Sequence, residues 1–206
     1  MFSTKEKKER SLGAKLFLKP HRCSSPKCVT VRRPTKPGLH GKMRRRALSE
    51  YGQQLMEKQK IKFTYGIREA QMRKVFEAAA KHRGITGEMI INFLERRLDN
   101  VVYRLGLALS RSVGRQLVGH GHIIVNGKKV TIPSYEIKAN DVIAIRPQSK
   151  DHHEFKDLAE RLKQYEPPIW LFLDKALFEG KVISLPKDFE IPFDVTLVVD
   201  YYSKIS

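Results

Sequence analysis

Two arginines in the middle of the chain have a spacing that suits phosphate binding. Arg111 and Arg115 stand four residues apart in a segment of helical character, so they share one helix face. A guanidinium group can hold phosphate oxygens through paired hydrogen bonds. We therefore predict that this segment binds a nucleic-acid backbone, through Arg111, Arg115, Gln116, His120, His122 and Lys128.

A second basic stretch, VRRPTKPGLHGKMRRR, occupies residues 31–46. Prolines and glycines interrupt it, so we expect no regular element there. A run of charge is usually a solvated surface, but a simple linker rarely needs this many cations. We interpret the stretch as an extended strand that threads between RNA helices. The predicted contacts in and just before it are Arg22, Lys27, Arg32, Arg33, Lys36, His40, Lys42, Arg44, Arg45 and Arg46.

The two cysteines could supply half of a zinc site. Cys23 and Cys28 flank a proline-containing turn, with His21 and His40 nearby in the sequence. A structural zinc ion needs four ligands, and this set does not close a tetrahedron. We expect no zinc and no other cofactor, and keep the two cysteines as weak candidates for metal binding.

No combination of residues indicates catalysis. The histidines have neither a paired nucleophile nor the spacing of a metal site. The tripeptide Arg97-Leu98-Asp99 resembles one at the catalytic aspartate of some pseudouridine synthases, but here it begins a predicted helix and no segment is left over for a catalytic domain. We interpret Asp99 as a charge favoured by the helix dipole. The protein is therefore predicted not to be an enzyme.

The composition indicates a folded protein with a polyanionic partner. The 206 residues are 41% hydrophobic and carry a formal net charge of +18. Residues 1–60 hold 17 Lys and Arg against 4 Asp and Glu, so the excess charge lies mainly at the N-terminal end. No apolar run approaches the ~20 residues of a membrane-spanning helix. The N-terminus lacks the pattern of a secretory or transit peptide, which predicts a cytoplasmic protein without a membrane role.

Periodicity predicts helices before the central segment. Residues 1–20 should be an irregular arm that orders on its partner. Ser49 is a plausible N-cap for a helix to about Ile61, a second helix should end near Gly84, and a third should begin at Thr86. The predicted RNA contacts on this helical region are Tyr51, Lys58, Arg68, Arg73 and Lys74.

The central segment should form two helices packed on an antiparallel sheet. Leu98, Val101, Val102 and Leu105 recur at helical spacing. Asn126-Gly127 predicts a two-residue type I′ hairpin, and residues 141–146 a further strand. Residues 153–165 read as a helix, and residues 170–174 and 181–185 should extend the sheet. The tail, FDVTLVVDYYSKIS, has strand propensity.

The strings RLDNVVYRLG and GRQLVGHGHIIVNGKKV resemble the S-four RNA-binding module, in the version found in the fourth small-subunit ribosomal protein of bacteria. The resemblance runs from about Lys15 to the C-terminus, through CSSPKC, WLFLD and YYS. Some members have a second cysteine pair upstream, which this chain lacks. Ser112, Val113 and Gly114 replace the arginine, glutamine and alanine common in the family, and Gly114 should weaken its helix by about 1 kcal/mol relative to Ala.

The resemblance implies an α+β protein in which a basic arm and a helical domain precede the module. We expect the arm at 1–46, the helical domain at 47–95, the module with its sheet extension at 96–185, and a tail at 186–206 that returns to the helical domain, as a helix in the family. Propensity and family precedent disagree about that tail, so its element type stays open.

The resemblance also implies a function and partners. The protein would be a structural component of the small ribosomal subunit that binds a multi-helix junction of ribosomal RNA during assembly. It would touch the third and fifth small-subunit proteins, lie near the messenger entry path and contribute to accuracy; no homo-oligomer is expected. The alternatives are an RNA-modification or ribosome-rescue factor with the same module, or a translational repressor of its own messenger.

Overall fold

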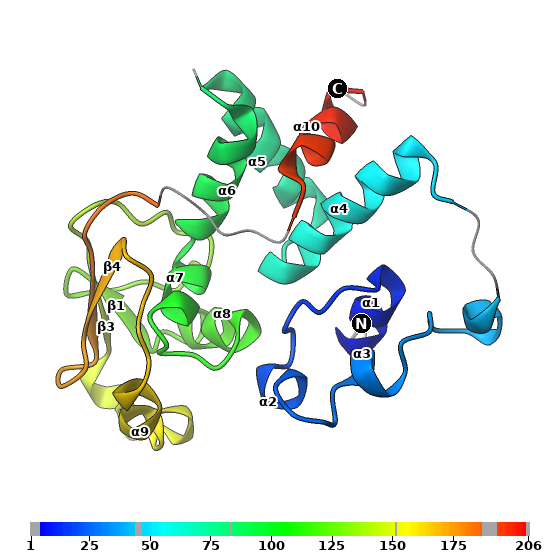
Figure 1. The fold of residues 1–206 in the computed structure, drawn as a ribbon. Coiled ribbons are helices and arrows are strands. Elements are labelled where there is room, and N and C mark those ends of the chain that lie inside the picture. Colours follow the sequence, from blue (N-terminus) through cyan, green and yellow to red (C-terminus); the bar gives the residue numbers. More distant parts are fainter. Residues whose placement is uncertain (1–4, 44–46, 83, 151, 187–192, 205–206) are drawn as a thin grey trace. The chain divides into compact units, whose positions relative to one another are not determined.

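The chain folds into two compact units. The computed structural model describes residues 5–43, 47–82, 84–150, 152–186 and 193–204. One unit, here called the helical unit, comprises Met1–Ile90 with Glu190–Ser206, and the other, the sheet unit, comprises Ile91–Phe189. The predicted α+β class is confirmed, with helices in both units and one five-stranded sheet in the second (Figure 1).

The helical unit is built around a long helix, α4. Its predicted N-cap is confirmed, because the Ser49 side chain accepts a hydrogen bond from the Gly52 N–H. α4 continues to Tyr65 rather than to Ile61, and ends at the left-handed Gly66. The helices of this region are α4 Glu50–Tyr65, α5 Glu69–Lys81 and α6 Thr86–Glu95, of which α6 runs across the boundary between the units.

The N-terminal arm was predicted to be irregular, and that prediction is wrong for its described part. It contains α1 Lys5–Leu12, α2 Pro20–Cys23, α3 Val29–Arg32 and the short 3-10 helix η1 Leu39–Lys42. A buried carboxylate organises it: Glu9 accepts hydrogen bonds from the backbone N–H groups of Leu16 and Leu18, at 3.2 and 3.1 Å. Composition alone could not predict this contact, because a glutamate in a lysine-rich segment is expected to be solvated.

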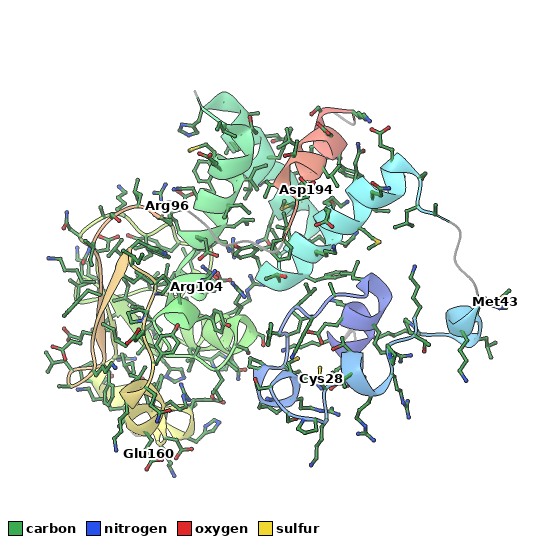
Figure 2. All side chains as sticks on the ribbon, viewed as in Figure 1. Cys28, Met43, Arg96, Arg104, Glu160 and Asp194 are labelled. Atoms are coloured by element: carbon green, nitrogen blue, oxygen red, sulfur yellow. The ribbon has the colours of Figure 1, made fainter. Side chains whose placement is uncertain are left out.

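The C-terminal tail is a helix, α10 Val195–Ser203, packed on α4 and α5 (Figure 1). Asp194, labelled in Figure 2, caps it by accepting from two backbone N–H groups. The Tyr202 ring stacks on Phe76 with centroids 5.0 Å apart, and Tyr201 lies 5.7 Å from the Tyr51 ring. Burial of these two tyrosines outweighs the local strand propensity of the tail.

The sheet unit packs two helices, α7 Leu98–Arg104 and α8 Arg111–Gly119, on its sheet. The apolar stripe of α7 is wholly buried, as its spacing predicted. The strand order is β2-β1-β3-β5-β4, and every neighbouring pair is antiparallel. The strands are β1 Ile123–Val125, β2 Lys128–Lys129, β3 Val142–Ile145, β4 Leu171–Asp174 and β5 Glu179–Val182.

The predicted hairpin turn is confirmed. Asn126 and Gly127 both have positive φ, 50° and 75°, as a type I′ turn requires. The Asn126 side chain also ties the turn to the next strand, donating to Asp141 and accepting from the Val142 N–H. β4 and β5 extend the sheet as predicted, with β5 beginning two residues earlier than expected, at Glu179.

The predicted helix over residues 153–165 is broken into two pieces. After η2 Pro147–Ser149, the chain forms the 3-10 helix η3 His153–Phe155 and then α9 Leu158–Lys163. Phe155 and Leu158 both lie in the core of the sheet unit, as their spacing predicted. Within the described residues, no helix is both long and apolar enough to cross a membrane.

Gly114 lies where α8 comes closest to α7, and this contact reverses the expectation from helix propensity. A Cβ atom added at Gly114 would stand 2.6 Å from the backbone oxygen of Asp99. The two helices would have to separate to accept it. We therefore expect Gly114→Ala to bring none of the ~1 kcal/mol gain that propensity predicts. Chemical denaturation of the two proteins measures this, and an increase of about 1 kcal/mol in the free energy of unfolding would show that the helices separate freely.

Candidate nucleic-acid interface

The clearest candidate surface for RNA is the stretch of residues 32–43, here called the basic loop, which begins at the last residue of α3 and includes η1. With Arg10 it lines a partly open pocket of about 450 Å³. Arg10 organises the loop from α1: its guanidinium donates to the backbone oxygens of Arg33 and Thr35, both at 3.1 Å, and of Lys36, at 3.3 Å. These bonds hold residues 33–36, which belong to no helix or strand, in a defined shape.

The cations of the basic loop have no carboxylate partner within the described part of the chain. They are Arg32, Arg33, Lys36 and Lys42. All but Lys36 are exposed, and Lys36 is half-buried. Such cations are the groups that release counterions when they meet phosphates. Predicted contacts at Arg44, Arg45 and Arg46 lie outside the described residues.

Other predicted contacts of the helical unit are also exposed. Lys27 and His40 face solvent, as does the ring of Tyr51 at the start of α4. Arg22 is tied to Glu6 by an ion pair of 2.6 Å, which leaves its guanidinium partly accessible. On α5 and at its N-terminus, the exposed cations Arg68, Arg73 and Lys74 form the predicted basic face.

Lys58 does not fit the predicted RNA contact, and that prediction is corrected. Only 4% of its side chain is exposed. Its ammonium donates to Glu69 at 2.8 Å and to the Tyr201 hydroxyl at 3.1 Å, and lies 4.3 Å from the centre of the Tyr201 ring. Lys58 therefore holds α10 on α4 and α5. Its spacing on α4 gave no sign of this role, because Tyr201 is 143 residues away in the sequence.

Glu69 is the carboxylate on which this network converges. Burial acts to raise its pKa, but hydrogen bonds from Lys58, Lys62 and Tyr202 outweigh burial and lower the pKa to about 2. Reciprocally, burial and the hydrogen bond to Glu69 raise the pKa of Tyr202. The network thus favours an ionised Glu69 and a protonated Tyr202 in the folded chain.

These contacts predict a loss of stability in acid. The pKa of Glu69 is lower in the folded chain than its ordinary value of 4.5, so its stabilising effect is complete above about pH 4.5 and disappears as the pH falls towards 2. We expect Glu69→Gln to flatten the decline of unfolding free energy between pH 5 and 2. Glu77→Gln, an exposed change on the same helix, is the control and should keep the wild-type decline. Equal declines in all three proteins would contradict the assignment.

Arg111 and Arg115 share a face of α8, but both are engaged by groups at α7. Arg115 donates to the Asp99 carboxylate, with Nη2 at 2.6 Å from Oδ2. Arg111 donates to Asn100 Oδ1 at 2.7 Å and stacks on the Tyr103 ring at 4.7 Å. Both side chains stay partly exposed, Arg111 at 18% and Arg115 at 35%. The two arginines thus fix α8 on α7, and their contact with phosphate remains a prediction.

A buried polar network underlies this face. Glu95 accepts two bonds of 2.9 Å from Arg104, which Figure 2 labels, and a third from Asn100. Asp99 accepts a two-fold contact from Arg97, at 3.1 and 3.0 Å. Asp99 does lie in the first turn of α7, as the dipole argument requires, but its main partners are two guanidinium groups. Sequence inspection missed Asn100 and Glu95, whose only signal was their position beside the apolar stripe.

The remaining predicted contacts of the sheet unit are accessible. Gln116, His120 and Lys128 are exposed, and His122 is half-buried. They come from the end of α8, the segment before β1, and β2.

Both cysteines are buried. Cys28 Sγ lies 3.0 Å from the Thr30 hydroxyl, and Cys23 Sγ lies 3.8 Å from a carboxylate oxygen of Glu9. Burial raises the pKa of the Cys23 thiol, and the hydrogen bond with Thr30 lowers the pKa of Cys28. Among the described residues, no group of three or more His, Cys, Asp or Glu side chains is arranged to hold a metal ion.

Comparison with known proteins shows the class to which this protein belongs. Residues 96–143 match the family model of the S4 domain, and residues 2–95 match that of the ribosomal protein S4/S9 N-terminal domain. Small ribosomal subunit protein uS4 of Halothermothrix orenii is 48% identical over 197 residues, which cover 95% of this chain and 94% of the relative. Its counterparts uS4 in Pelotomaculum thermopropionicum and uS4A in Clostridium novyi are 50% and 52% identical over the same shares. The chain belongs to the uS4 family of small-subunit ribosomal proteins.

Proposed function

We propose that this protein is a structural component of the small ribosomal subunit and binds its RNA through phosphate contacts from both units. Family membership supports the ribosomal role and a place in the cytoplasmic ribosome. The basic loop supports this mechanism, because its four cations have no carboxylate partner among the residues that the structure describes, and Arg10 holds its backbone in shape. Cations held in this way can follow the shape of folded RNA without reading its sequence.

The more specific role in this proposal is to bind a multi-helix RNA junction early in assembly. Two compact units with separate basic surfaces could contact different RNA helices and hold them together. In this proposal the protein also touches the third and fifth small-subunit proteins, lies near the messenger entry path and contributes to accuracy. It acts without a catalytic group or bound cofactor, through charge and shape alone.

The first test is stoichiometry on small subunits washed in high salt. We expect an integral component to stay near one copy per subunit, even though high salt weakens each phosphate contact. Recovery of the protein only in the wash would instead indicate a modification or rescue factor that visits the subunit.

A further inference from the structure

Four histidines form a row of neighbouring rings on the sheet unit. The ring centroids of His120 and His122 are 6.0 Å apart, those of His122 and His152 are 4.6 Å apart, and those of His152 and His153 are 4.4 Å apart. The first two follow α8, and the other two begin η3, so the fold joins segments that are 30 residues apart in sequence between His122 and His152. We call these four side chains the histidine row.

Among the residues that the structure describes, the charged groups recorded beside the histidine row are mainly cationic. Arg146, which follows β3, and Lys129 in β2 both repel a positive charge on His122. The carboxylate of the half-buried Glu154 lies 3.3 Å from the His153 ring. His122 Nδ1 is 3.0 Å from the Ser149 hydroxyl, and His152 Nδ1 accepts from the Glu154 N–H at 3.4 Å. The row therefore gathers hydrogen-bond donors and cations around rings that can themselves become charged.

We propose that the histidine row binds a backbone phosphate of the ribosomal RNA and takes up a proton when it does so. This inference rests on the proposed function and adds His152 and His153 to its contacts. An anion fits the row better than a metal ion, because the four rings lie one after another, each beside the next. Among the described residues, no group of three or more His, Cys, Asp or Glu side chains could hold a metal ion. His120 also caps the C-terminus of α8, where the helix dipole favours a positive charge.

Proton uptake follows from the charge balance of the row. In the free protein, burial and then repulsion from His152, His120, Arg146 and Lys129 lower the pKa of His122. An anion within about 4 to 6 Å favours the charged form of a histidine and raises its pKa. RNA binding should therefore strengthen as the pH falls, by up to about ten-fold per pH unit for each proton taken up.

The experiment measures the affinity of the full chain for small-subunit ribosomal RNA at pH 8, 7 and 6, at constant salt and with a metal chelator present. We expect the wild type to bind about three- to ten-fold more tightly per unit of pH decrease. Two double variants test the row: His152→Asn with His153→Asn, and His120→Asn with His122→Asn. Asparagine keeps an acceptor near the position of Nδ1. Each pair should lose at least about half of the slope of log affinity against pH.

The control is His82→Asn, an exposed histidine at the end of α5 outside the row, which should keep the wild-type slope. Wild-type slopes in both double variants would overturn the inference, and so would affinity of the wild type that does not change with pH. Unchanged binding at pH 8 with unchanged slopes would overturn only this inference. Failure of the wild type to bind the RNA at any pH would overturn the proposed function itself.

Discussion

Asp99→Asn is expected to lower the free energy of unfolding of the sheet unit by about 3 to 5 kcal/mol. Asp99 is 3% exposed and Arg97 is 6% exposed, so the carboxylate neutralises a guanidinium that cannot reach water easily. Removing its charge leaves Arg97 buried without its carboxylate partner and also weakens the contact that Arg115 makes with residue 99. Denaturant unfolding monitored by circular dichroism measures the loss.

The control for Asp99 is Asp157→Asn. Asp157 is exposed and makes no side-chain hydrogen bond at the N-terminus of α9, so its replacement should change stability by less than about 0.5 kcal/mol. A second variant separates the charge from the packing. Replacing Arg97 by Met together with Asp99 by Leu should recover much of the loss, because apolar groups of similar volume need no counterion. If Asp99→Asn costs no more than the control, the Asp99 carboxylate neither stabilises the buried Arg97 nor holds α8 on α7.

Neutralising the basic loop should remove the largest single part of the RNA affinity. We expect the combined change of Arg32, Arg33, Lys36 and Lys42 to Gln to weaken binding of small-subunit ribosomal RNA roughly 10²- to 10³-fold near 0.1 M salt. Four lost phosphate contacts should also reduce the slope of log affinity against log salt by about 3. Filter binding at several salt concentrations gives both quantities.

The matched control removes the same charge from cations that are already engaged. Lys19, Lys60 and Lys204 pair with carboxylates, and Lys175 donates to the Lys163 backbone oxygen. Changing these four to Gln should reduce the salt slope by less than about 1. Equal effects of the two sets would mean that only total charge matters and that the basic loop has no special role. Unchanged unfolding midpoints would show that both proteins are folded.

The elements of the sheet unit could be predicted because local signals and tertiary contacts agree there. The apolar spacing of α7 faces the core, and Asn126-Gly127 makes the turn that its two residues favour. The tail shows the opposite case: its β-branched residues favour a strand, but Tyr201 and Tyr202 stabilise a helix by packing on residues far away in the sequence. Gly114 is a similar case: helix propensity disfavours it, but its lack of a side chain allows the close contact with the Asp99 backbone.

The sequence by itself determined the RNA-binding character of this protein, its family resemblance and its class of fold. Charge, apolar period and turn residues are local properties, and they can be read without knowing what lies opposite them. Only the tertiary structure decided which cations remain for RNA and which hold the protein together. Lys58 is buried against Glu69, Arg115 is paired with Asp99, and Arg32 keeps no carboxylate partner among the described residues. A cation's role depends on its partner, and those partners meet only when the chain folds.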